Sequence, residues 1–103
     1  MQRGTKVMNL TKEVNGKELV IGIDGRLDTQ TAPELETFIN ENCADVDALT
    51  LDCEKLTYVS SAGLRVFLTF QKKMQGSMKL KNVCEIVMEV FEMTGFADIL
   101  TIE

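Results

Sequence analysis

Alternating apolar and polar residues predict two neighbouring strands near the start of the chain. Segments 6–14 and 17–24 both have this β-like pattern, and the apolar residues of the second segment share one face. The dipeptide Asn15-Gly16 between them suits the positive φ angles of a two-residue type I′ turn. We therefore expect the two segments to form a hairpin.

The rest of the chain alternates between helical and strand patterns. Apolar residues spaced by three or four positions predict a helix at three places, and a short apolar run precedes the second and the third. The expected order after the hairpin is a helix over 31–43, a strand over 48–53, a helix over 62–75, a strand over 78–83, a helix that ends at Gly95, and a terminal edge strand over 98–102.

Two of the helix starts have the spacing of a capping box. Thr31 precedes Glu34 by three residues, and Asn82 precedes Glu85 by the same interval. In a capping box the first side chain accepts a bond from an N–H at the helix start, and the glutamate bonds back to the first residue. We therefore expect Thr31 and Asn82 to cap the first and the third helix.

Strands that alternate with amphipathic helices need crossover connections. This predicts an α/β fold, with a mixed sheet of four to five strands covered by about three helices. The length of 103 residues fits a single domain, 1–103, that can bury its own core. Functional loops in such sheets lie beyond the carboxyl ends of the parallel strands. If the second and third strands are parallel, the loops at 25–31 and 59–63 form one surface.

Charge and composition narrow the class of function. The chain has 11 Lys and Arg against 16 Asp and Glu, a net charge of −5, without a basic stripe. We expect no nucleic-acid partner, because binding the phosphate backbone needs clustered cations, and the acidic balance favours a protein that carries a basic patch. We find no apolar stretch typical of a secretion signal or of a membrane span. We therefore expect a cytoplasmic protein without membrane insertion, and a monomer.

The residue types that carry most enzyme and metal chemistry are scarce. The sequence has no histidine, so a Ser-His-Asp triad cannot form and the usual metal ligand near neutral pH is missing. Cys43, Cys53 and Cys84 are widely spaced, and each lies in an apolar pattern. We interpret them as reduced core residues, with no disulfide framework and no CxxC site. The sequence thus predicts neither a metal, a cofactor nor catalysis.

The stretch TYVSSAGLR, at 57–65, connects the central strand to the middle helix. Serine is a common N-cap, so Ser60 and Ser61 have a purely structural interpretation. However, no acidic residue follows either serine at capping-box spacing, which leaves the partial positive charge of the helix start without a neutralising side chain. The N–H groups and the dipole of the helix start would stabilise a phosphate on one of these serines. Arg65, four residues after Ser61, is either a second phosphate ligand or a solvated surface residue.

Three blocks of the sequence resemble the STAS family, and the likeness is greatest to stand-alone bacterial anti-sigma factor antagonists. The blocks are GRLDTQTAPELE at 25–36, LTLDCEKLTYVSSAGLRVFL at 49–68 and VMEVFEMTGFADILTI at 87–102. The resemblance implies a STAS-type mixed sheet. It also implies two partners: an anti-sigma factor with serine kinase activity, which binds and phosphorylates the unmodified chain, and a metal-dependent Ser/Thr phosphatase, which reverses the modification.

The family's strand-to-helix loop commonly reads Asp-Ser-Ser-Gly-Leu, and the serine after the Asp accepts the phosphate. Aligning the Gly-Leu pair with Gly63-Leu64 places the acceptor on Ser61 and puts Ser60, the second candidate, at the Asp position. The resemblance also places the preceding loop beside the acceptor. The implied partner-binding residues are Asp28, Thr29, Ser60, Ser61, Ala62, Gly63 and Arg65.

Three functions stay open at this point. The first is a non-catalytic switch that sequesters an anti-sigma factor until Ser61 is phosphorylated. The second is a non-phosphorylated STAS scaffold subunit of a transporter or other assembly, which the missing Asp keeps open. The third, an enzyme with Ser61 as nucleophile, would need Lys55, Lys72 or Lys73 as base. Asp28 also has a structural interpretation, as the acceptor in an Asx turn ahead of the helix.

Overall fold

Four strands form one mixed sheet in the computed structural model, which describes residues 8–103. The strands lie in the order β1-β2-β3-β4, where β1 pairs with β2 antiparallel and the pairs β2–β3 and β3–β4 are parallel. Their bounds are β1 Met8–Asn15, β2 Glu18–Leu27, β3 Ala48–Val59 and β4 Met78–Lys81. The expected mixed sheet and the parallel second and third strands are confirmed, although β2 and β3 are longer than predicted. Residues 6 and 7, also predicted as strand, lie outside the described residues.

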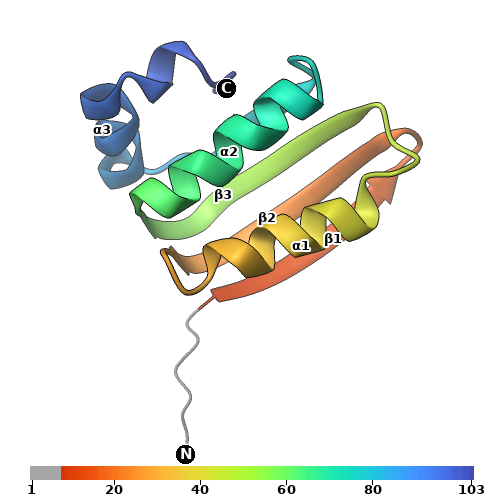
Figure 1. Ribbon diagram of the computed structural model, residues 1–103, viewed down its shortest axis with the longest axis horizontal. Coiled ribbons are helices and arrows are strands. Elements are labelled where there is room, and N and C mark those ends of the chain that lie inside the picture. The colour runs from red at the N-terminus through yellow and green to blue at the C-terminus, as the bar shows by residue number, and fades with distance from the viewer. Residues whose placement is uncertain (1–7) are drawn as a thin grey trace, which may run out of the picture.

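Helices α1 and α2 lie side by side across one face of this sheet (Figure 1). They span Ala32–Asn42 and Ser61–Lys73, and α3 spans Glu85–Thr94. Helix α3 packs beside α2, where the rings of Phe67 and Phe91 meet edge to face with centroids 6.0 Å apart. The terminal edge strand predicted at 98–102 is wrong. A short 3₁₀ turn covers Phe96–Asp98, and of the predicted strand only Ile102 pairs with the sheet, through a single parallel bridge to Leu80.

The hairpin forms as expected, but its turn is shifted by one residue. Asn15 pairs with Glu18, so the two turn residues are Gly16 and Lys17. Gly16 has φ 64°, whereas neither Asn15 nor Lys17 is among the described residues with positive φ. The predicted type I′ turn at Asn15-Gly16 is therefore wrong, because only the first turn position takes a left-handed conformation, as in a type II′ turn.

Neither predicted capping box forms. Thr31 is the N-cap residue of α1, but its hydroxyl makes no cap hydrogen bond because it is used inside the preceding loop. Helix α3 has Cys84, not Asn82, as its N-cap residue. Asn82 instead takes a left-handed conformation with φ 60°, and its amide donates to Asp52 Oδ1 at 3.1 Å. Asparagine tolerates this conformation better than most residues.

The core lies between the sheet and the helices. Alternate residues of β2 and β3 point into it, and three phenylalanines from α2 and α3 fill the space between. The fully buried large side chains are Leu19, Ile21, Ile23, Leu27, Leu35, Ile39, Leu49, Leu51, Leu56, Phe67, Phe70 and Phe91. All three cysteines are free thiols; Cys43 and Cys53 are buried as predicted, whereas Cys84 is only partly buried. Burial raises the pKa of the Cys53 thiol to about 12, which keeps it protonated and unreactive.

Gly63 allows the start of α2 to sit directly on the ends of β2 and β3. A Cβ atom at this position would lie 2.7 Å from Leu27 Cγ and 2.8 Å from Val59 Cγ2. Both neighbours are buried, so neither can move away without disturbing the core. The missing side chain therefore sets how closely the helix approaches the two strand ends.

We expect Gly63→Ala to destabilise the fold. Overpacking a core typically costs about 1–3 kcal/mol, and the better helix propensity of alanine offsets up to about 1 kcal/mol of this. Urea denaturation measures the difference, with the exposed Thr69→Ala in the same helix as a control that should change stability by less than about 0.5 kcal/mol. Equal stability of Gly63→Ala and wild type would show that the contact is not tight.

Candidate functional site

The carboxyl ends of β2 and β3 bring two loops together at one edge of the sheet (Figure 1). Leu27 pairs with Val59 in the last step of the parallel ladder, and the Ser60 N–H then donates to the Leu27 carbonyl at 2.9 Å. The chain leaves β2 into the loop before α1, and leaves β3 directly into α2. The sequence-based expectation that loops 25–31 and 59–63 share a surface depended on this parallel arrangement, and the structure has it.

The loop after β2 is ordered by the Asp28 carboxylate and the Thr31 hydroxyl. Asp28 Oδ1 accepts from the backbone N–H groups of Gln30 and Thr31 at 3.0 and 3.2 Å. Thr31 Oγ1 accepts from the Asp28 N–H and donates to the Arg26 carbonyl, both at 2.8 Å. The structural interpretation of Asp28 as an Asx-turn residue is confirmed. Its contact with a partner stays a prediction, and exposed Thr29 lies at the tip of this loop.

The same contacts set the charge state of Asp28. Desolvation acts to raise the pKa of its carboxyl, but hydrogen bonds from Thr31 and Gln30 and the nearby charge of Arg26 outweigh it and hold the pKa below its ordinary value. The loop therefore carries a fixed negative charge at neutral pH, close to the start of α2.

The two serines at the start of α2 have different environments. Ser61 is the first residue of the helix and is exposed. Ser60 is the N-cap residue, with extended backbone angles of φ −101° and ψ 178°, but its side chain makes no cap hydrogen bond. Its hydroxyl oxygen is buried and has no hydrogen-bond partner among the described residues. Of the two candidate phosphate acceptors, the structure thus places Ser61 within reach of another protein and turns the Ser60 hydroxyl away from solvent.

The start of α2 also differs electrically from the other helix starts. Helices α1 and α3 carry Glu34 and Glu85 in their first turns, whereas α2 has no acidic residue there. Its N–H groups therefore keep their partial positive charge, equivalent to about half a unit charge at a helix N-terminus. This agrees with the expectation from the sequence.

Arg65 lies one helical turn beyond Ser61 and is exposed. It lines a shallow depression of about 200 Å³ between the first halves of α1 and α2, together with Thr29 and Ala62. Within residues 8–103 its guanidinium forms no ion pair. Gly63, in contrast, is a buried residue of α2, so its contribution to the surface is the packing described above. The predicted partner-binding residues are thus close together, but only some of them expose a side chain at the surface.

Sequence reasoning missed Arg26 and Tyr58. They face each other across β2 and β3, with the Arg26 guanidinium 4.2 Å from the centre of the Tyr58 ring. Arg26 Nε also lies 3.9 Å from Asp28 Oδ2. Tyr58 is 38% exposed. Irregularities in the β2–β3 pairing, between Gly22 and Asp24 and between Gly25 and Arg26, change which residues face outward, and the alternation of the sequence does not reveal them.

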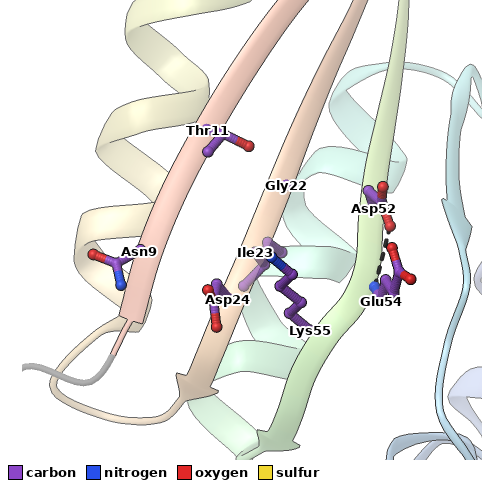
Figure 2. Close-up of a pocket in the computed structure, with 8 residues that line it drawn as sticks. All are labelled: Asn9, Thr11, Gly22, Ile23, Asp24, Asp52, Glu54 and Lys55. Carbon is purple, nitrogen blue, oxygen red and sulfur yellow. Dashed lines mark hydrogen bonds between the residues drawn. The ribbon is translucent and has the colours of Figure 1, made fainter.

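A second depression lies on the sheet face away from α1 and α2 (Figure 2). Its volume is about 240 Å³, and it forms where Gly22 lacks a side chain opposite Thr11. Asp24, Asp52 and Lys55 border it without a common point of convergence (Figure 2). Across residues 8–103 we find no cluster of three or more His, Cys, Asp or Glu side chains that could hold a metal ion. Nor is any helix in this range long and apolar enough to cross a membrane.

The sequence matches the STAS domain family over residues 9–103, and the chain belongs to this family. It is 33% identical over 100 residues to the anti-sigma-B factor antagonist of Bacillus subtilis, covering 92% of both chains. It is also 35% identical over 102 residues to BtrV of Bordetella bronchiseptica, a protein named as an anti-sigma factor antagonist, covering 92% of this chain and 85% of that one.

Solved structures agree on the fold. An anti-sigma factor antagonist from Mycobacterium paratuberculosis superposes with a TM-score of 0.83 at 21% identity, covering 92% of this chain and 84% of the other. Unphosphorylated SpoIIAA, also an anti-sigma factor antagonist, superposes with a TM-score of 0.77 at 20% identity, over 92% and 88% of the two chains. The STAS-type mixed sheet with three helices, expected from the sequence, is confirmed.

We expect Thr31→Val to destabilise the protein by about 1–3 kcal/mol, because the Asp28 N–H would lose its acceptor in a site where Thr31 is only 2% exposed. Urea denaturation of the purified variant measures this. Thr29→Val, two residues away and exposed, is the matched control and should stay within about 0.5 kcal/mol of wild type. Similar losses in both variants would contradict the assigned hydrogen bonds.

The stability contributed by Asp28 should depend on pH. Its pKa in the folded protein is lowered, so the contribution is present above the ordinary pKa of 3.8 and is lost as the pH falls through the folded value. Urea midpoints of wild type and Asp28→Ala, measured from about pH 7 down to about pH 2.5, isolate this carboxyl because all other acidic groups are shared. The difference between the two proteins should shrink on acidification. A difference that is constant or grows would contradict the assignment.

Proposed function

We propose that this protein is an anti-sigma factor antagonist that works as a phosphorylation-controlled partner switch in the cytoplasm. In this proposal the unmodified monomer binds an anti-sigma factor that has serine kinase activity, and so frees the sigma factor. The kinase transfers a phosphoryl group to Ser61, and the complex dissociates. The observation that carries the proposal is the exposed Ser61 hydroxyl at a helix start that has neither an acidic first turn nor a side-chain cap.

The relatives support the choice of partner. Two proteins that are 33% and 35% identical over nearly the whole chain are named anti-sigma factor antagonists. Among the structures with the same fold, SpoIIAA is described in an unphosphorylated form and in a phosphorylated form. The net charge of −5 suits a partner with a basic docking surface.

The site can receive a phosphate without disturbing the fold. Phosphorylation of Ser61 adds a charge of about −1.5 to −2 and three acceptor oxygens. The free N–H groups at the start of α2 and the helix dipole stabilise a negative group at this position. The Arg65 guanidinium, on the same face of the helix, supplies a charge-assisted bond. The modified domain therefore stays folded.

The phosphate instead weakens the binding of the partner. A protein docked on Ser61 and the Asp28 loop would have to accommodate a dianion next to a carboxylate that is already fixed in place. Burying this extra charge without a counter-charge weakens binding. The same surface can thus bind the anti-sigma factor tightly when Ser61 is unmodified and poorly when Ser61 is phosphorylated.

The reaction needs no catalytic residue from this chain. The Ser61 oxygen attacks the γ-phosphorus of ATP bound to the anti-sigma factor, its proton passes to a base of that kinase, and ADP leaves. A metal-dependent Ser/Thr phosphatase then cleaves the phosphoserine P–O bond with water, restoring the hydroxyl and releasing inorganic phosphate. The chain itself is a substrate and a binding partner.

Incubation with the cognate anti-sigma factor and ATP should add one phosphoryl group, located at Ser61 by intact mass and peptide mapping. Ser61→Ala should stay unmodified. Ser61→Asp should bind the anti-sigma factor more than about tenfold more weakly than wild type. Ser77→Asp is the matched control, because Ser77 is exposed and follows the opposite end of α2.

Two outcomes would contradict the switch. One is an unmodified chain after incubation with an active cognate kinase. The other is equal affinity of wild type and Ser61→Asp. A chain that instead co-purifies with a membrane transporter complex and with no kinase would support the scaffold function that the sequence left open.

A further inference from the structure

The Ser60 hydroxyl is the one buried side-chain oxygen or nitrogen in residues 8–103 that has no hydrogen-bond partner. Buried hydroxyl groups are almost always bonded, because an unpaired one loses its water without compensation. Ser60 is also at a position where a partner is close, since an N-cap serine usually accepts a bond from the N–H two or three residues further on. The side chain does not use this option.

The backbone of Ser60 is fixed on both sides. Its N–H donates to the Leu27 carbonyl at 2.9 Å, and its carbonyl accepts from the Leu64 N–H at 2.9 Å. Only the rotation about the Cα–Cβ bond is therefore free, and it has three staggered positions. One of them is the inward position seen here. A rotation about this bond is therefore the movement that can take the oxygen out of its buried site.

We propose that Ser60 is a positioning residue for the phosphoryl group of Ser61: its hydroxyl leaves the unpaired inward position and donates a hydrogen bond to a phosphate oxygen. The inference rests on the proposed function only in that Ser61 is the modified residue. Unmodified, the loop stores an unsatisfied donor. Modified, it gains an acceptor that carries charge, and hydrogen bonds to charged acceptors are stronger than neutral ones.

The donor is neutral, and this decides the sign of the interaction. A serine hydroxyl next to a dianion is attractive, whereas a carboxylate at the same position is an acceptor only and carries like charge. Ser60 therefore favours the doubly charged phosphate over the singly charged one. The preference is measurable as a titration, because phosphoserine has its second pKa near about 6.

The test places phosphoserine at position 61 by genetic encoding, so that no kinase is needed. ³¹P NMR then follows the phosphate titration in the wild-type background and in Ser60→Ala, Ser60→Asp and Ser77→Ala. We expect Ser60→Ala to raise the second phosphate pKa by about 0.5–1 unit, Ser60→Asp to raise it further, and Ser77→Ala to leave it unchanged. The unmodified Ser60→Ala protein should be at least as stable as wild type, because it loses only an unpaired group.

Phosphate pKa values in wild type and Ser60→Ala that agree within about 0.2 unit would overturn the proposal. So would a lower value in Ser60→Asp than in wild type. These results do not depend on the kinase assay. A chain that no anti-sigma factor phosphorylates would refute the switch without affecting the titration. Equal phosphate pKa values would refute the role of Ser60 without affecting the switch.

Discussion

The last step of the β2–β3 ladder is the contact on which the site depends. Leu27 pairs with Val59, and the next N–H along the chain, that of Ser60, bonds to the Leu27 carbonyl. This parallel pairing places the end of β2 beside the start of α2. Without it the Asp28 loop and the serine loop would be separate features of the surface. Gly63 then lets the helix lie against both strand ends, so the geometry of the surface follows from the packing of the core.

The charges on this surface allow the folded domain to accept a negative group that a bound partner would not accept. The negative charge of Asp28 is held by backbone N–H groups within its own loop, not by the N–H groups of α2. The helix start keeps its positive potential, with Arg65 nearby and Ser61 exposed. A negative group added at Ser61 is thus stabilised by the helix start, and it repels the Asp28 carboxylate and any acidic group of a protein docked there. The buried Ser60 hydroxyl, unpaired within residues 8–103, is the donor that we propose for a phosphate at Ser61.

The sequence predicted most of the fold because its strands and helices bury apolar residues at regular intervals. The alternation in β2, the spacing in α2 and the order of elements as far as α3 were correct, since each depends on which face meets the core. The predictions that failed concern the terminal strand, the hairpin turn and single hydrogen bonds. Thr31 and Asn82 have the right spacing for capping boxes, yet tertiary partners, the Arg26 carbonyl and the Asp52 carboxylate, bind their side chains instead.

The residues of the candidate site also divide into those that the sequence predicts and those that it does not. Ser61, Asp28 and Arg65 could be singled out from the sequence, because a serine at a helix start and an aspartate before one have known physical roles. Arg26 and Tyr58 could not, because their stacking depends on irregular strand pairing that local sequence does not encode. The inward turn of the Ser60 hydroxyl was equally hidden, since the serine type alone is compatible with capping.

The central claim is that the loops after β2 and β3 act as one docking surface. The most direct measurement is an NMR titration of the ¹⁵N-labelled protein with its anti-sigma factor, following every backbone amide. We expect the largest changes at 26–31 and 58–66, and little change at the opposite end of the sheet, at 15–17 and 74–77. Changes concentrated at that opposite end, or on the uncovered sheet face around Gly22, would contradict it.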